Sequence, residues 1–311
     1  MKSRDTLIRL KRFQADEKRR RVVQIETMIA EFGRMAGDLD REIAAYDGEI
    51  HYADARMGEL FDRLSAAGVL DDTLVIVVGD HGEGLMQHGW MNHGMMIYDE
   101  AIHVPLVVRW PGHIPAGSTS DALVQNLDFA ETFLDAAGVK QPDGLNGKSL
   151  WPVLTSTKSG QVDPARTWVI TGRERHVGDA REGNLPYPQR ALRTKDYLYV
   201  RNFAPDRYPL GDPKGLTADK APTADALTNN TYAAFPDMDA SPTKAWLVAH
   251  RNDKEWKPYF GYAFGKRPAE ELYDLAADPD QMRNVAADKG HEATRKRLAD
   301  QLTKALTDAG D

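Results

Sequence analysis

The 311-residue sequence predicts an α/β core, a partial mixed sheet flanked by helices, followed by a smaller C-terminal α+β domain on an antiparallel sheet. Three observations lead to this prediction. The apolar, β-branched run at 73–78 is typical of a buried strand. Apolar residues between Ile43 and Leu64 recur at helical spacing before it. Further along the chain, short apolar runs indicate the strands of a small antiparallel sheet, at 168–171, 191–193 and 197–201.

The first 45 residues predict one or two amphipathic helices, and a further helix over 43–64 is expected to end at Gly68. Basic residues gather at Lys11-Arg12 and at Lys18–Arg21. Acidic residues are interleaved with them, which favours a solvated helix face over a nucleic-acid or membrane contact. The apolar residues at helical spacing are Ile25, Met28, Ile29, Phe32 and Met35.

Composition and charge limit the class of protein. A formal net charge of −7 favours solubility and argues against general nucleic-acid binding. No stretch is long and apolar enough to cross a membrane, and the first twenty residues lack the apolar region of a signal peptide. The absence of cysteine excludes disulfides and thiolate metal sites. Localisation stays open between the cytoplasm and, if a signal peptide was lost with the N-terminus, the periplasm or secretion.

The segments after the first strand complete the core domain. A second short strand is expected at 106–109, and a helix at 128–137 with Phe129, Phe133 and Leu134 facing inward. The polar stretch at 155–165 contains Gly160 and Pro164 and is the best domain boundary. We therefore predict a core domain over 1–155, with 1–45 as a charged helical lead-in, and a C-terminal domain over 156–311.

Within the C-terminal domain, residues 204–245 have little periodicity and predict a long surface loop. A short strand or turn is expected at 270–275, and a closing helix at 294–306.

Asp80 and His81 follow the strand at 73–78, and their side chains are suited to bind a metal ion. In open α/β sheets, ligands sit outside the carboxyl ends of the strands. The Asp80 carboxylate suits a hard cation such as Ca²⁺, whereas the His81 imidazole suits zinc and other transition metals. The alternative is that Asp80 caps the next helix and His81 packs. Glycines and two more histidines, His88 and His93, follow and favour a site.

Longer motifs flank this pair. They are Tyr46-Asp-Gly-Glu-Ile-His-Tyr-Ala-Asp54 upstream, then His93-Gly, Val104-Pro-Leu-Val-Val-Arg-Trp-Pro-Gly112 and Gly147-Lys-Ser-Leu. In this order they resemble the sulfatase family of the alkaline-phosphatase superfamily. Gly172-Arg-Glu-Arg-His176 makes the second half similar to the C-terminal region of bacterial heparan N-sulfatase-like and arylsulfatase-like enzymes. The resemblance runs from about Tyr46 to the end of the chain.

The resemblance implies a sulfatase fold and hydrolysis of sulfate esters or sulfamates on a carbohydrate. It assigns Asp80 and His81 to a divalent metal, calcium by family and zinc or manganese as alternatives. It places His93 where it would bind sulfate or act as the acid. The family's formylglycine nucleophile arises from Cys/Ser-x-Pro-x-Arg, and this chain has neither a cysteine nor that serine motif. We therefore expect the C-terminal part of a sulfatase, inactive alone, whose partner is a missing N-terminal portion.

A second cluster predicts a subsite for an anionic group of the substrate. Arg173, His176 and Arg190 lie close in sequence to the second-half motifs, and Arg recognises sulfate-like anions through paired donors. His88 is a further substrate-binding candidate. The alternatives are that the arginines form structural ion pairs with nearby acidic residues and that His88 packs within its loop.

Two other functions fit parts of the same pattern. An Asp-His pair at a strand end also suits a metal-dependent phosphodiesterase or phosphonate hydrolase of the same superfamily. The missing nucleophile suits a non-catalytic sulfatase-like protein that binds sulfated glycans.

Overall fold

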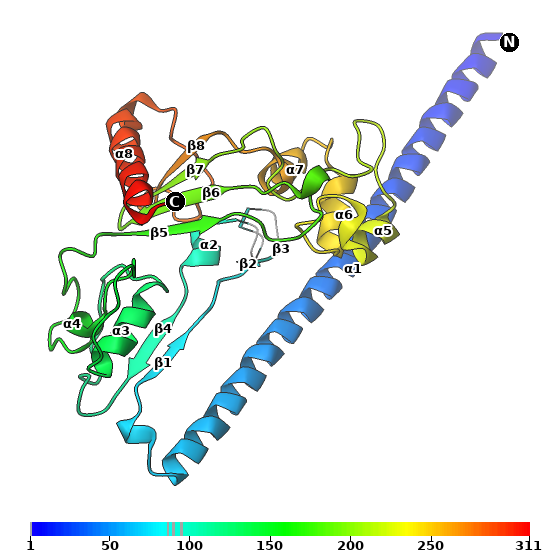
Figure 1. Cartoon of the computed structure of the whole chain (residues 1–311). Coiled ribbons are helices and arrows are strands. Elements are labelled where there is room, and N and C mark those ends of the chain that lie inside the picture. The colour runs from blue at the N-terminus through cyan, green and yellow to red at the C-terminus, as the bar shows by residue number, and fades with distance from the viewer. Residues whose placement is uncertain (1, 86, 89–90, 94–95) are drawn as a thin grey trace. The chain divides into compact units, whose positions relative to one another are not determined.

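The computed structural model divides the chain into two compact units, residues 1–70 and 71–311 (Figure 1). The first unit is helical, and the second carries all the described strands. Among the helices that the structure describes, none has the length and apolar character needed to cross a membrane. The backbone is described for residues 2–85, 87–88, 91–93 and 96–311.

The first unit is one long helix, α1 (Lys2–Ala66). The sequence predicted at least two helices here, but no proline interrupts this stretch, so the backbone hydrogen bonds continue through both. The helix ends at the predicted glycine: Gly68 has φ 71°, and its amide donates to the Ser65 carbonyl at 2.9 Å. The apolar side chains predicted between Ile25 and Met35 lie outside the described residues.

The second unit begins with a two-stranded antiparallel ladder. The short helix η1 (Leu70–Asp72) leads into β1 (Val75–Val78), which pairs with β4 (Leu106–Arg109). Both strands confirm the predicted runs. The predicted mixed sheet is not found in the described part of the chain, because β1 pairs there with β4 alone and in antiparallel sense. A mixed sheet would need a strand parallel to β1, and parallel strands are joined by a crossover connection.

Between β1 and β4 the chain forms a short hairpin and a helical turn. The hairpin strands are β2 (Gly84–Leu85) and β3 (Met91–Asn92), and Gly84 lies opposite Asn92. The turn α2 (Asp99–Ile102) follows and returns the chain to β4. This excursion carries the three histidines that the sequence singled out.

Helix α3 (Asp128–Ala136) forms as predicted; Phe129 and Leu134 are partly buried, but the prediction for Phe133 is wrong. Phe133 was expected to point inward and is 50% exposed, while Asp128 and Thr132 are buried. The buried Asp128 carboxylate accepts hydrogen bonds from the amide of Lys148 and from the guanidinium of Arg166. This polar network, formed with residues outside the helix, fixes which face is covered.

The C-terminal sheet has four antiparallel strands in the order β5-β6-β7-β8 (Figure 1). Its first three strands confirm the predicted runs and extend them by a few residues. The fourth comes from the segment predicted as a strand or turn. The strands are β5 (Trp168–Arg173), β6 (Gln189–Thr194), β7 (Tyr197–Asn202) and β8 (Glu270–Asp274).

Both faces of this sheet are covered. Successive residues of a strand point to opposite faces, so neighbours on β6 and β7 enter different cores. On one face Leu192 and Tyr199 pack with Leu298 and Leu302 of the closing helix α8 (Glu292–Ala309). On the other face, Ala191, Leu198, Val200 and Tyr273 pack against a helical layer that includes α6 (Pro242–Ala249) and α7 (Lys257–Phe264).

The segment 204–245 is not the surface loop that the sequence predicted. It contains two short helices, α5 (Ala224–Asn229) and η3 (Thr231–Ala233), and it buries Leu210 and Phe235 completely or nearly so. These apolar residues are irregularly spaced, so each reaches the core through its own turn and no period reveals them. The remaining short helices are α4 (Trp151–Leu154), η2 (Glu182–Asn184) and η4 (Lys289–His291).

Candidate functional site

The loop after β1 holds Asp80 and His81 at the end of the strand. The Gly79 amide donates to the Pro105 carbonyl, and the Gly82 amide donates to the Ala101 carbonyl. A Cβ at Gly82 would lie 2.0 Å from the carbonyl oxygen of Glu100, so only glycine allows the loop to approach α2 this closely. The two candidate metal ligands are thus fixed by backbone contacts on both sides.

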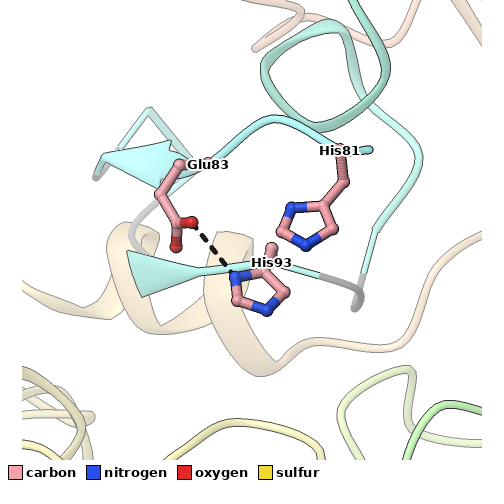
Figure 2. A group of neighbouring side chains, drawn as sticks. All are labelled: His81, Glu83 and His93. Atoms are coloured by element: carbon pink, nitrogen blue, oxygen red, sulfur yellow. Dashed lines mark hydrogen bonds and ion pairs between the residues drawn. The ribbon is translucent and has the colours of Figure 1, made fainter. Parts of the chain in front are cut away.

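The hairpin brings His93 back to this loop. Continuing the register beyond the Gly84–Asn92 pair places Glu83 opposite His93. In agreement, His93 Nδ1 lies 3.1 Å from the Glu83 carboxylate oxygen Oε2 (Figure 2). His81 lies two residues before Glu83, and in extended chain such residues share a face.

His81 and His93 face each other. Their rings stack with centroids 3.9 Å apart and planes inclined by 18° (Figure 2). One ligand atom from each of His81, Glu83 and His93 lies within 4.8 Å of the others. The side chains of His81 and His93 are 40% and 45% exposed, so this group is accessible to a metal ion or an anion.

Asp80 lies beside this group and is highly exposed. Its Oδ1 accepts a hydrogen bond from the His81 amide at 3.0 Å, and its Oδ2 lies 3.6 Å from His81 Nε2. The first contact keeps the carboxylate next to the imidazole. The structure therefore brings together three residues that the sequence singled out, Asp80, His81 and His93, and it adds Glu83.

His88 does not join them. Its ring is buried, with Nδ1 2.6 Å from the Glu100 carboxylate and Nε2 2.9 Å from the Gln281 carbonyl. It also stacks on Tyr98, with ring centroids 4.1 Å apart. Both ring nitrogens are occupied, so the geometry favours the packing alternative over the predicted contact with substrate.

The same stretch of chain is anchored to the C-terminal sheet by one buried and one partly buried polar contact. Tyr98 donates to the Glu271 carboxylate at 2.9 Å, and burial followed by this negative charge raises the pKa of the tyrosine. Arg193 on β6 forms two hydrogen bonds with the Asp99 carboxylate, at 3.1 and 2.8 Å. These contacts hold the hairpin and α2 against the sheet.

The predicted arginine subsite is built around an aspartate that the sequence did not single out. Asp237 is buried and accepts a hydrogen bond from Arg173 at 2.7 Å and from Arg181 at 3.2 Å. His176 Nδ1 lies 3.3 Å from the other carboxylate oxygen, and 38% of that side chain is exposed. Arg173 is buried, which lowers its pKa to about 10. No sequence spacing signals Asp237, which lies 64 residues from Arg173.

Arg190 is also engaged within the protein. Its guanidinium bonds both carboxylate oxygens of Asp311, at 2.5 and 2.8 Å, and Glu174 at 2.7 Å. The hydrogen bond to Asp311 raises the pKa of Arg190, despite partial burial that lowers it. Of the predicted substrate-binding residues on the C-terminal domain, His176 is therefore the one with a substantial part of its side chain exposed.

Comparison with known proteins indicates a family. The sulfatase family model matches residues 10–139. Over this stretch the chain is similar to the sulfatase family. The match to this family starts within α1 and well before Tyr46, so the expectation that the resemblance begins at about Tyr46 is corrected.

Individual sulfatases show the same similarity. The chain is 46% identical over 110 residues to N-acetylglucosamine-6-O-sulfatase of Bacteroides thetaiotaomicron, covering 35% of this chain and 20% of that relative. It is 28% identical over 273 residues to N-sulphoglucosamine sulphohydrolase of Homo sapiens, covering 85% and 47%. The chain thus spans less than half the length of these curated relatives.

A solved structure shows the same fold. The chain aligns with a protein solved in complex with its substrate, D-glucosamine-2-N,6-O-disulfate, at a TM-score of 0.57 and 24% identity. The alignment covers 83% of this chain and 39% of that one. The fold is therefore a sulfatase-like α/β fold, with the antiparallel four-stranded sheet described above.

Proposed function

We propose that this chain supplies the metal-binding and leaving-group side of a sulfatase active site that hydrolyses sulfate esters or sulfamates on carbohydrates. The observation that carries the proposal is the convergence of Asp80, His81 and His93 at the end of β1, where ligands sit in α/β sheets. We also propose that the chain consists of a core domain over 1–155 and a C-terminal domain over 156–311.

Each residue of the loop takes a role that its surroundings support. Asp80 and His81 would help to hold a divalent metal, whose chemistry when bound is to polarise a sulfate oxygen. His93 would donate a hydrogen bond to a sulfate oxygen or protonate the departing oxygen or nitrogen. Glu83 orients the His93 ring through the 3.1 Å contact at Nδ1, which directs Nε2 away from the carboxylate.

The nucleophile is not among these residues. The chain has no cysteine and no Ser-x-Pro-x-Arg, so no residue of it can be converted to formylglycine in that motif. We place the formylglycine, which would attack sulfur and form the covalent intermediate, on a segment outside these 311 residues.

The substrate class is a sulfated amino sugar or a related glycan. Two similar proteins are named for N-acetylglucosamine-6-O-sulfate and N-sulphoglucosamine chemistry, and the solved neighbour holds a disulfated glucosamine. His176 is the best supported contact to a second anionic group, because its side chain is 38% exposed beside a cluster with two arginines. Arg173, Arg190 and His88 support such a contact less, since each is engaged within the protein.

Two measurements test the proposal. The purified chain is incubated with glucosamine-6-sulfate and with N-sulfoglucosamine, and sulfate release is followed; we expect no turnover. Sequencing of the native locus upstream of the Met1 codon is expected to reveal an in-frame Asp-Asp pair followed by Cys/Ser-x-Pro-x-Arg. Sulfate release by the chain alone that Asp80→Ala abolishes would refute the assignment of the nucleophile to another segment.

A second function is favoured by one observation, the imidazole of His81 next to Asp80. Imidazole suits zinc, and zinc-dependent cleavage of phosphodiesters or phosphonates needs no formylglycine supplied from elsewhere. This alternative predicts that the zinc-loaded chain cleaves a nitrophenyl phosphodiester and leaves the corresponding sulfate ester intact.

A further inference from the structure

We propose that α1 pairs with α1 of a second copy of this chain in a parallel, two-stranded coiled coil. The helix is 65 residues long and runs without interruption from Lys2 to Ala66. A periodic helical pattern much longer than about 25 residues is typical of a coiled coil. The inference goes beyond the proposed function and is independent of it, because the loop after β1 takes no part.

The first argument is a seven-residue repeat in the sequence of α1, with positions labelled a to g. From Val22 to Leu64, which is six heptads, every residue at positions a and d is apolar. These thirteen residues, which we call the seam, are Val22, Ile25, Ile29, Phe32, Ala36, Leu39, Ile43, Tyr46, Ile50, Ala53, Met57, Leu60 and Leu64. In a straight α-helix such a repeat drifts by about 20° per heptad, or about 120° over six. So long a seam therefore stays in contact only with another helix that supercoils with it.

The second argument is the exposure of the seam. Among its members whose side chains the structure describes, Val22, Ile43, Ile50 and Leu60 are each more than half exposed. All glycines of α1 lie at other positions of the repeat, so none leaves a gap in the seam. An exposed apolar face of this length marks a surface that binds another protein.

The third argument is the area that the pairing would bury. Six heptads with a rise of about 1.5 Å per residue form a seam about 63 Å long, and a helix is about 10 Å wide. Covering this strip removes about 630 Å² of surface from each helix and about 1,300 Å² from the pair, which is in the range of stable, specific interfaces. A second copy of α1 carries the same repeat over the same length, so it covers the whole seam.

The residues of the seam favour two parallel strands. Position a holds a β-branched residue in four of its seven occurrences, and position d holds leucine twice. β-branched residues at a with leucine at d favour parallel dimers. Parallel pairing in register also brings identical positions of the two copies together along the whole seam.

The charged positions beside the seam give the pairing a sign that can be tested. In a parallel coiled coil, position g of one helix faces position e of the next heptad on its partner, which places Glu49 opposite Asp54 of the second copy. Both side chains are exposed in the single chain. Exposed charge pairs contribute little, so this repulsion weakens the dimer slightly and leaves the apolar seam dominant.

The first test is the mass of the full 311-residue chain, measured by sedimentation equilibrium across the micromolar range. We expect a dimer. Ile43→Glu combined with Ile50→Glu places two charges in the seam and should give a monomer. Ala44→Glu combined with His51→Glu places the same charges one residue further along, outside the seam, and should leave the dimer intact. Circular dichroism verifies that helicity is kept, which is expected because Glu favours helix at least as well as Ile.

Cross-linking tests the direction and register of the helices. The chain has no cysteine, so Ala53→Cys introduces a single thiol at position d. Under mild oxidation it should link two copies by a disulfide, because parallel helices in register bring the two thiols together. Ala55→Cys, at position f on the outer face, is the control and should remain a free thiol.

A charge reversal tests the contact beside the seam. Asp54→Lys turns the repulsion from Glu49 of the second copy into attraction, and it should tighten the dimer at least about threefold. Asp62→Lys makes the same change at an exposed position f and should leave the dissociation constant unchanged. A monomeric wild-type chain, a dimer that survives both glutamates in the seam, or equal cross-linking of Ala53→Cys and Ala55→Cys would overturn the inference.

Discussion

The loop at the end of β1 and the cluster around Asp237 both contain charged or titratable side chains. Those of the loop are largely exposed, whereas the arginines of the cluster are buried and paired. In the loop, His81 and His93 are 40% and 45% exposed. In the cluster, Arg173 and Arg181 are buried, and both bond a buried carboxylate. A group of charged residues is a candidate site when its ligand atoms face solvent, and a structural element when those atoms are already paired inside the protein.

Removing Asp237 should have the largest effect on stability. Asp237→Ala leaves two buried guanidinium groups without their counter-charge, which costs about 3–5 kcal/mol. Urea unfolding followed by circular dichroism measures this, with Asp206→Ala at an exposed position as the control. A loss below about 1 kcal/mol would contradict the structural role of the cluster.

The lowered pKa of Asp237 predicts that the stability of the protein depends on pH. Burial raises the pKa of Asp237, but the His176 hydrogen bond and the charges of Arg173 and Arg181 lower it by more, so the net shift is downward. Since the folded-state pKa lies below the unfolded value of about 4, the stabilisation is complete above that pH and disappears as the pH falls through the folded pKa. The stability difference between wild type and Asp237→Ala should therefore shrink below about pH 4.

Lys244 is a second buried charged residue, and its removal should have an intermediate effect on stability. Its ammonium group donates to three backbone carbonyls, and burial lowers its pKa to about 8. Lys244→Met leaves these carbonyls unpaired and should cost about 1–3 kcal/mol. Because the unfolded state keeps its proton up to about pH 10, the advantage of wild type over the variant should increase from about pH 8 to 10. Lys220→Met, at an exposed lysine, should show no such increase.

His88 and His93 lie in the same excursion of the chain, one buried and one exposed, and allow the comparison to be tested there. His88→Ala removes the two hydrogen bonds of a buried ring and should destabilise the protein by about 1–3 kcal/mol. His93→Ala should change stability by no more than about 0.5 kcal/mol, because the side chain is 45% exposed. Thermal unfolding of the two variants measures both changes. A larger loss of stability for His93→Ala than for His88→Ala would mean that His93, and not His88, is the structural residue.

A small effect on stability is expected at the partly exposed pair of Arg190 and Asp311. Asp311 is 45% exposed at its side chain, so solvent screens the attraction. Asp311→Asn should cost less than about 1 kcal/mol, and the cost should fall further in high salt. A loss as large as that of Asp237→Ala would mean that Arg190 belongs to the buried cluster.

Local patterns predicted most of the regular structure. The strands at 106–109 and 197–201 and the closing helix appear where alternation and helical spacing place them. The errors have a common cause. Phe133 points outward because Asp128 bonds with residues beyond its own helix, and 204–245 is buried because its apolar residues reach the core without any period.

The candidate site was predictable only in part. The run 73–78 followed by Asp80 and His81 indicated a ligand site from the sequence, and the order of motifs indicated the sulfatase family. Nothing in the sequence marked Glu83 as part of the site, because single glutamates are equally common in exposed turns that bind no ligand.

The sequence by itself determined where β1, β4, the sheet strands β5 to β8 and the closing helix form, and that a carboxylate and an imidazole follow β1, because these depend on neighbouring residues. Only the tertiary structure decided which donors meet. The hairpin register joined His93 to Glu83, and packing on the sheet buried His88 and paired Arg173 with Asp237. Such contacts between distant residues depend on how the elements pack, which no local pattern records.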